Sequence, residues 1–368
     1  MTGRLLSFPA RMACSEEGRA VARRILEASP SERLSKVRHF RLEEPDGLLS
    51  VCAYLRDQLG TIPAKVRDEA EFFYRFLEKP RRAIGLFDER QYFLGEFALI
   101  AGTACRQLSR RDESRLWFDR AESGFRHTAN AVGDLSRLGY QRLALRMEER
   151  QLEAVLEMAP ALIETLRGLG MPEEALKCRF LEGLALMESS QLEESVVVFQ
   201  EICREAEQLG SEKLLASSYG NLTHIYGMLG DSTKALDSSR RAIPLLRRLD
   251  DRVALAKVQW GIATLLRELG QISASVETYR TAQQEFGRIG MRADVAALSL
   301  VVADLLLESG KDQEAMREVL AALPIIDELK MVPEGVAALS LLRESLRHQK
   351  INRQALRDLH GYFEEIQK

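Results

Sequence analysis

Histidines, cysteines and acidic pairs are the side chains of this 368-residue chain that could do chemistry, and their spacing does not assemble a catalytic centre. The histidines are His39, His127, His224, His348 and His360. None belongs to an HExxH motif or to a metal-ligand pair at helical spacing. The chain also lacks a GxSxG nucleophile motif and the glycine-rich loops GxGxxG and GxxxxGK[ST] that hold phosphates. We therefore expect no enzyme activity, no metal and no cofactor.

The remaining reactive groups have structural interpretations. Acidic pairs such as Glu173-Glu174 and Glu193-Glu194 open predicted helices, where they complement the helix dipole rather than act as a general acid and base. The cysteines are odd in number, form no CxxC pair and are predicted to be buried thiols. They are Cys14, Cys52, Cys105, Cys178 and Cys203. A hydrolase built on helices is the alternative, and it would need His, Asp and Glu to cluster in space.

Composition favours an all-helical protein. Hydrophobic residues make up 46% and charged residues 29% of the chain, with only 10 Pro. A formal net charge of −3 argues against a general nucleic-acid binder. No segment reaches the roughly 18 consecutive apolar residues that span a membrane, and Arg11 interrupts the short apolar start, so a cytoplasmic location is expected.

The first 41 residues are the exception to this charge balance. They hold nine basic residues against four Glu. Such a segment can touch nucleic acid or acidic lipid, but the basic residues alternate with apolar and acidic ones at helical spacing. We interpret the segment as a solvated helix face.

The strongest signal in the sequence is an internal repeat. The segments RGLGMPEEA, EQLGSEKLLA, RRLDDRVALA, GRIGMRADVA and DELKMVPEGVA begin at Arg167, Glu207, Arg247, Gly287 and Asp327, a step of 40 residues each time. A second recurring position lies midway between these segments, at Ser190, Gly230, Gly270 and Gly310. Each unit is therefore predicted to be a helical hairpin, with a left-handed residue at its turn and Asp231 or Ser232 capping a following helix.

These hairpins resemble tetratricopeptide repeats (TPRs). In the unit NLTHIYGMLGDSTKALDSSRRAI, Leu222 and Tyr226 match the packing positions of the first helix, and Gly230 matches the turn. Ala235 and Ala242 match the places where the second helix must be small. Thr223 and Ser239 depart from the usual glycine and aromatic residue. The 40-residue length resembles the extended repeats of bacterial regulatory proteins and kinesin light chains.

The resemblance implies an all-α, right-handed superhelical α-solenoid of stacked helical hairpins. It covers about six units, over residues 91–350, and stacking is required because one hairpin cannot bury its apolar face. Residues 351–368 are expected to form a C-terminal capping helix. Residues 1–90 are expected to be degenerate hairpins that extend the array, and a separate small helical bundle is the alternative.

In a TPR array the first helices line a concave groove, so the resemblance also indicates candidate binding residues. One position of the first helix, called position two below, recurs in successive units and is occupied by Glu96, Arg137, Lys177, Ser217, Lys257 and Ala297. Cations interleaved with aromatic and amide side chains suit a peptide that carries a carboxylate. In peptide-binding TPR proteins an asparagine at the place of Asn221 contacts the ligand backbone. The candidate groove residues are Arg137, Tyr140, Gln141, Lys177, Phe180, Asn221, His224, Lys257, Trp260 and Thr264.

The function expected from these residues is a scaffold or adaptor that binds a protein or peptide in the groove. Its partner would present an acidic segment or a C-terminal carboxylate, not nucleic acid or membrane, and homodimerisation stays open. The alternative is a peptide-sensing regulator with an N-terminal output module, similar to the quorum-sensing Rap and PlcR proteins. That alternative requires an effector fold within residues 1–90, where no helix-turn-helix signature is evident.

Overall fold

The structure of the protein, a computed structural model, describes residues 45–79 and 87–331 together with a few isolated positions, and over these ranges it is all-α. Cys14, most of the basic segment 1–41 and the expected cap at 351–368 lie outside the described residues. The chain divides after Ser190 into two compact units. No helix within the described ranges is long and apolar enough to cross a membrane.

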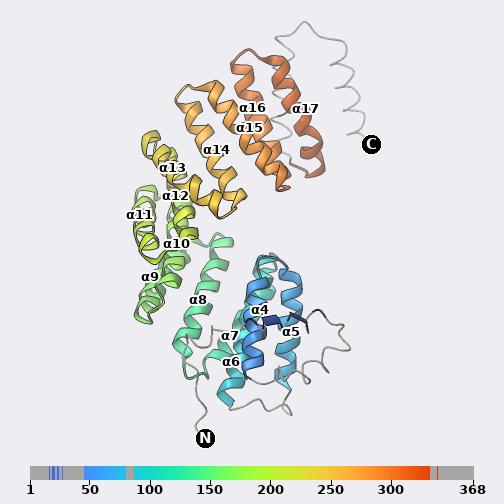
Figure 1. The fold of residues 1–368 in the computed structure, drawn as a ribbon, viewed down its shortest axis with the longest axis vertical. Helices are drawn as coiled ribbons and strands as arrows, with labels where there is room; N and C mark the ends of the chain where they lie inside the picture. The colour runs from blue at the N-terminus through green and yellow to red at the C-terminus, as the bar shows by residue number, and fades with distance from the viewer. Residues whose placement is uncertain are drawn as a thin grey trace. The chain divides into compact units, whose positions relative to one another are not determined.

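The first unit holds helices α4 to α10, which pack in succession along the chain (Figure 1). They are α4 (Pro45–Gln58), α5 (Pro63–Glu78), α6 (Phe87–Gln107), α7 (Arg111–Phe125), α8 (Ala131–Glu148), α9 (Leu152–Gly168) and α10 (Pro172–Glu188). Helices α4 and α5 share one hydrophobic core with α6, α7 and α8. The described residues before position 80 are therefore packed onto the repeats that follow them.

The second unit holds helices α11 to α17, which also pack in chain order. They are α11 (Leu192–Leu209), α12 (Glu212–Met228), α13 (Ser232–Arg248), α14 (Arg252–Glu268), α15 (Ile272–Arg288), α16 (Arg292–Glu308) and α17 (Asp312–Glu328). Nearly all of them are 17 residues long, so two helices and their turns account for the predicted 40-residue unit.

The turns explain the strict period. From residue 150 to residue 330, every twentieth residue has a positive φ, whether it is glycine or not. At the turn around Gly230, whose φ is +75°, the Asp231 N–H donates to the Tyr226 carbonyl at 2.9 Å, which is the bond that closes a Schellman motif. The Asp231 side chain then accepts from the backbone N–H of Lys234 and caps the next helix, as predicted.

The packing positions taken from the TPR resemblance are confirmed. Leu222 and Tyr226 are buried on α12, and Ala235 and Ala242 are fully buried on α13. Alanine at these two places lets the helices of a hairpin approach each other closely, since a larger side chain would hold them apart. Thr223, which stands where glycine is usual, is buried and bonds its hydroxyl to the Tyr219 carbonyl of its own helix.

Candidate functional site

Position two of the repeats, where the groove cations were predicted, forms a buried ion cluster in the first unit. Glu96 on α6 is fully buried, and it accepts hydrogen bonds from both terminal nitrogens of Arg137 on α8. Arg56 on α4 donates to the same carboxylate at 3.0 Å. We call Glu96, Arg56 and Arg137 the carboxylate clamp. It joins three helices, so the Arg137 guanidinium is already bound within the fold.

The electrostatics of the clamp agree with its geometry. Burial alone would lower the pKa of Arg137, but the charge and hydrogen bonds of Glu96 outweigh it and hold that pKa above the ordinary value. The neighbouring Tyr92 has a raised pKa, first because it is buried and then because of Glu96. Arg137 is therefore a permanent cation and Tyr92 stays a neutral phenol.

The other four candidates of the first unit are partly buried and have local contacts. Tyr140 packs against the core shared by α8, α9 and α10, and burial raises its pKa. Gln141 accepts a hydrogen bond from Arg106 at 3.3 Å. Lys177 pairs with Glu173 one turn earlier on α10 at 3.1 Å, and Phe180 is half-buried on the same helix.

In the second unit, Asn221 and His224 lie three residues apart on α12. The Asn221 amide donates to the Ser217 carbonyl of its own helix at 3.0 Å, and this is its one hydrogen bond to the described residues, so its side-chain oxygen is open. His224 is exposed. Partial desolvation by its neighbours lowers its pKa, so the imidazole is predominantly neutral at pH 7.

Helix α14 carries the remaining candidates. Lys257 is exposed and forms no ion pair with any residue the structure describes. Trp260 is half-buried and meets Phe286 edge-on, with ring centroids 6.1 Å apart. Thr264 hydrogen-bonds the Tyr279 hydroxyl at 2.9 Å. Trp260 and Thr264 therefore pack partly against α15, whereas Lys257 is left to solvent.

The cysteines and acidic residues do not offer a reactive centre in the described ranges. Cys52, Cys105, Cys178 and Cys203 are buried free thiols there, as predicted. Burial raises the pKa of Cys105 to about 11 and that of Cys178 to about 12, so neither is a thiolate at neutral pH. No group of three or more His, Cys, Asp or Glu in the same ranges could hold a metal ion.

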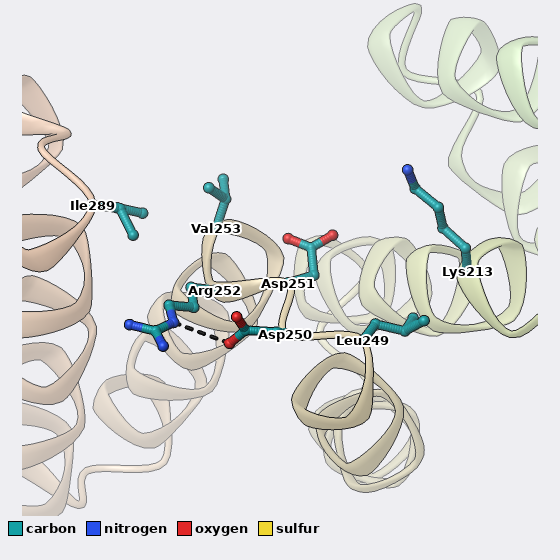
Figure 2. Close-up of a pocket in the computed structure, with 7 residues that line it drawn as sticks. All are labelled: Lys213, Leu249, Asp250, Asp251, Arg252, Val253 and Ile289. Carbon is teal, nitrogen blue, oxygen red and sulfur yellow. Dashed lines mark hydrogen bonds and ion pairs between the residues drawn. The ribbon is translucent and has the colours of Figure 1, made fainter. Parts of the chain in front are cut away.

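The sequence reasoning missed a hollow on the turn edge of the second unit. Its volume is about 440 Å³, and Figure 2 shows the side chains that line it. They are Lys213, Leu249, Asp250, Asp251, Arg252, Val253 and Ile289. Figure 2 shows Ile289 pointing toward Val253, and the Arg252 guanidinium paired with Asp250 at 3.0 Å. The sequence contains a signal for this hollow, because the third residue of each short segment that recurs every 40 residues, such as RRLDDRVALA, is Leu or Ile.

Comparisons with known proteins agree on the architecture. No protein-family model and no curated protein sequence matches the chain. A Rap protein complexed with competence and sporulation factor has a TM-score of 0.56 at 13% identity, covering 93% of this chain and 99% of that one. The apo form of the quorum sensor NprR from B. thuringiensis has a TM-score of 0.57 at 12% identity, with 90% and 98% covered.

A third structure carries the same repeat in its description. It is a signal transduction ATPase with numerous domains and a tetratricopeptide repeat sensor, from Pyrococcus horikoshii, with a TM-score of 0.61 at 10% identity. The match covers 97% of this chain and 64% of that one. The fold is that of a TPR array. At these identities the likeness fixes how the TPR hairpins pack, and it assigns no role to an individual side chain.

Proposed function

We propose that this TPR array is a scaffold that binds a protein or peptide on its first helices. The observation that carries the proposal is the set of polar side chains that hairpin packing does not use in the second unit. Asn221 presents an open amide oxygen, His224 is exposed, and the Lys257 ammonium is unpaired among the described residues. An amide binds peptide backbone, and an ammonium binds a carboxylate.

The similar proteins support this choice of ligand. One of them is a Rap protein complexed with competence and sporulation factor, and another is a quorum sensor. We propose a partner with an acidic segment or a free C-terminal carboxylate, with Lys257 as its main cation. Trp260 and Thr264 are proposed as flanking contacts on α14. In the first unit, Arg137 contributes to the scaffold through the carboxylate clamp, and Tyr140, Gln141, Lys177 and Phe180 are proposed as further groove residues of that unit.

The proposal places the protein in the cytoplasm and gives it no catalytic step, no nucleic-acid target and no membrane target. The peptide-sensing regulator is the second candidate. It is favoured by the packing of α4 and α5 onto α6, because a change at the repeats would reach residues 45–79 through that shared core. The proposed organisation is an N-terminal helical segment (1–90), six repeats (91–350) and a capping helix (351–368).

The test is a selection of displayed random peptides on the immobilised full chain. Peptides that are enriched would be synthesised with a free and with an amidated C-terminus, and their affinities measured by fluorescence anisotropy. We expect Lys257→Glu, and amidation of the peptide, each to weaken binding about tenfold, since a charge-assisted hydrogen bond contributes roughly 1.5–3 kcal/mol. Asn221→Ala is expected to weaken free and amidated peptides alike.

Lys311→Glu is the matched control, because Lys311 is also exposed but precedes a second helix, α17. It should leave every affinity unchanged. Arg137→Glu is avoided as a test, since it would place a second carboxylate beside buried Glu96 and unfold the clamp. The groove proposal is wrong if the selected peptides bind Lys257→Glu and Asn221→Ala as tightly as the wild type.

A further inference from the structure

The turns that lead from one hairpin to the next carry a row of apolar side chains in the second unit. The row consists of Leu209, Leu249, Ile289 and Leu329, one residue every 40 positions, and we call it the turn row. Each member directly precedes the left-handed residue of its turn. Leu209, Leu249 and Leu329 are exposed large apolar side chains, and Ile289 is partly buried. The hollow of about 440 Å³ lies between Leu249 and Ile289.

The opposite edge of the unit differs. Its equivalent positions, at the turns within hairpins, hold Leu229 and Leu269 but then Ser309. The residue four places after the turn position is Thr233 or Ser273 at that edge. On the edge of the turn row it is exposed Val253 after Leu249, but Lys213 after Leu209 and Ala293 after Ile289. A leucine before a left-handed turn is ordinary. A continuous row with a hollow is therefore a property of one edge.

The spacing of the turn row selects a helical ligand. Helices α12 and α14 are in direct contact midway along their length, since a Cβ placed on Gly220 would lie 3.4 Å from Val258, so successive units are about 8–10 Å apart there. Seven residues of an α-helix advance about 10 Å, so an apolar residue in every heptad meets every turn. An extended strand repeats its side-chain face about every 7 Å and falls out of step.

The charges around the row define the ligand further. The two central turns, residues 247–253 and 287–293, contain five arginines against two aspartates. Four of these arginines pair with acids, Arg248 with Glu212 and Arg292 with Glu328 among them, whereas Arg247 forms no ion pair among the described residues. Residues 207–213 and 327–331 each contain two acids and one lysine. A second copy paired across a two-fold axis would set the positive central turns against each other, which is unfavourable. The charge pattern therefore disfavours a homodimer through this edge.

We propose that the turn row docks an amphipathic helix of a partner protein, with one leucine-like residue per heptad and glutamates or aspartates flanking its two central heptads. The central leucine enters the hollow between Leu249 and Ile289. Lys213 and Arg247 are exposed and form no ion pair among the described residues, so they are open to the acidic side chains of the helix. This site is separate from the peptide groove of the proposed function and does not depend on it.

The test uses the full chain and a synthetic helical peptide of four heptads, about 42 Å long, with a leucine in each heptad and glutamates beside the central two. Fluorescence anisotropy at low and high salt measures its affinity. We expect Leu249→Ser to weaken binding about tenfold, or about 1.4 kcal/mol, since it removes apolar contact area from the hollow. Arg247→Glu should weaken binding and flatten its salt dependence.

The matched control is Leu229→Ser on the opposite edge, because Leu229 and Leu249 are both 38% exposed. Circular dichroism checks that both variants fold. The proposal is overturned if Leu229→Ser weakens binding as much as Leu249→Ser, or if a peptide with lysines in place of its glutamates binds as well. Sedimentation of the free protein is the last arm, and a dimer that Leu249→Ser dissociates would assign the row to a second copy. Asn221→Ala should leave this peptide's affinity unchanged, which separates the site from the groove.

Discussion

Position two of the repeat has opposite roles in the two units. In the first unit, Glu96 and Arg137 occupy this position in consecutive repeats and bind each other in the buried carboxylate clamp. In the second unit, Lys257 occupies it between Ser217 and Ala297, which carry no charge, and it is exposed. The same place in the same hairpin therefore supplies a structural cation in one unit and a solvent-exposed cation in the other.

The difference shows what decides the fate of a cation in a repeat array. The first helices α6 and α8 contact each other, and position two of one faces position two of the next. A carboxylate there withdraws the cation from solvent, as Glu96 does with Arg137. A small residue there, such as Ser217 before Lys257, leaves the cation available. At Arg137 the preceding repeat thus sets the role of the residue, whereas Lys177 at the same position pairs with Glu173 of its own helix.

Removing the clamp carboxylate is expected to have the largest effect. Glu96→Ala removes the partner that Arg137 and Arg56 share, while Asp134 stays 3.9 Å from Arg137, and breaking a buried ion pair in this way costs about 3–5 kcal/mol. Lys257→Ala should change the free energy of unfolding by no more than about 0.5 kcal/mol. Urea denaturation followed by circular dichroism measures both changes.

A double mutant tests whether the cost comes from the charge. Glu96→Met combined with Arg137→Met removes both central charges, while Arg56 is partly exposed and can be hydrated. We expect the pair to be less destabilising than the sum of the single changes by more than about 1 kcal/mol. Additive single and double effects would show that the clamp is ordinary packing.

A second comparison concerns how closely helices approach in each unit. A Cβ on Gly124 of α7 would lie 2.7 Å from the Gly95 backbone nitrogen of α6, whereas one on Gly220 of α12 would meet only the Val258 side chain, at 3.4 Å. We expect Gly124→Ala to destabilise by about 1–3 kcal/mol. Gly220→Ala should be tolerated or gain up to about 1 kcal/mol from helix propensity.

Thermal melts of these two variants test whether the loss of stability comes from the close contact between the helix backbones or from replacing a helix glycine as such. A matched control is Gly168→Ala on α9, where a Cβ would meet nothing within 4 Å. If Gly124→Ala melts no lower than Gly168→Ala, the close approach of α6 and α7 is not what requires glycine.

The turns behave alike in both units. Arg150 in the first unit and Asp250 in the second have φ of 58° and 49°, and a side chain in this region costs about 1–2 kcal/mol relative to glycine. Arg150→Gly and Asp250→Gly should each stabilise by about 1 kcal/mol, less for Asp250, which loses its ion pair with Arg252. Gly230→Ala should lower the free energy of unfolding by a similar amount. Calorimetry on all three variants measures these changes.

The sequence predicted the fold well because the repeat period is a local property. The 40-residue step, the turn at Gly230 and the small residues Ala235 and Ala242 depend on each hairpin alone, and all are confirmed. The pairing of Arg137 could not be predicted in this way. It depends on which residue of a neighbouring repeat lies opposite, and the burial of Glu96 is a property of three packed helices.

The turn edge was missed for a different reason. The predicted groove rests on polar side chains that bind peptides, whereas Leu209, Leu249 and Leu329 are part of the segments that define the 40-residue period. Apolar residues at a turn are indistinguishable in sequence from core residues. Their exposure becomes visible only when the turn is built, because Leu209, Leu249 and Leu329 are exposed whereas Ile289 at the equivalent place is partly buried.

The smallest expected effect is a shift in the pKa of His224, which tests how the polar side chains of the second unit are solvated. Desolvation lowers its pKa below the ordinary value of 6.5, so the folded protein binds this proton less readily than the unfolded chain does. The stability that the neutral ring contributes is therefore complete above the unfolded pKa and is lost as pH falls through it. NMR titration, with His224→Gln identifying the resonance, should give a pKa below 6.5 in the free protein.

Adding a selected peptide with a free C-terminal carboxylate should then raise that pKa if the carboxylate binds beside the ring, because a nearby anion favours the imidazolium. The amidated peptide is the control and should raise it less. A free-protein pKa at or above the ordinary histidine value would show that α12 leaves the ring fully hydrated. A peptide that binds without moving the pKa would place the carboxylate away from His224 and nearer to Lys257.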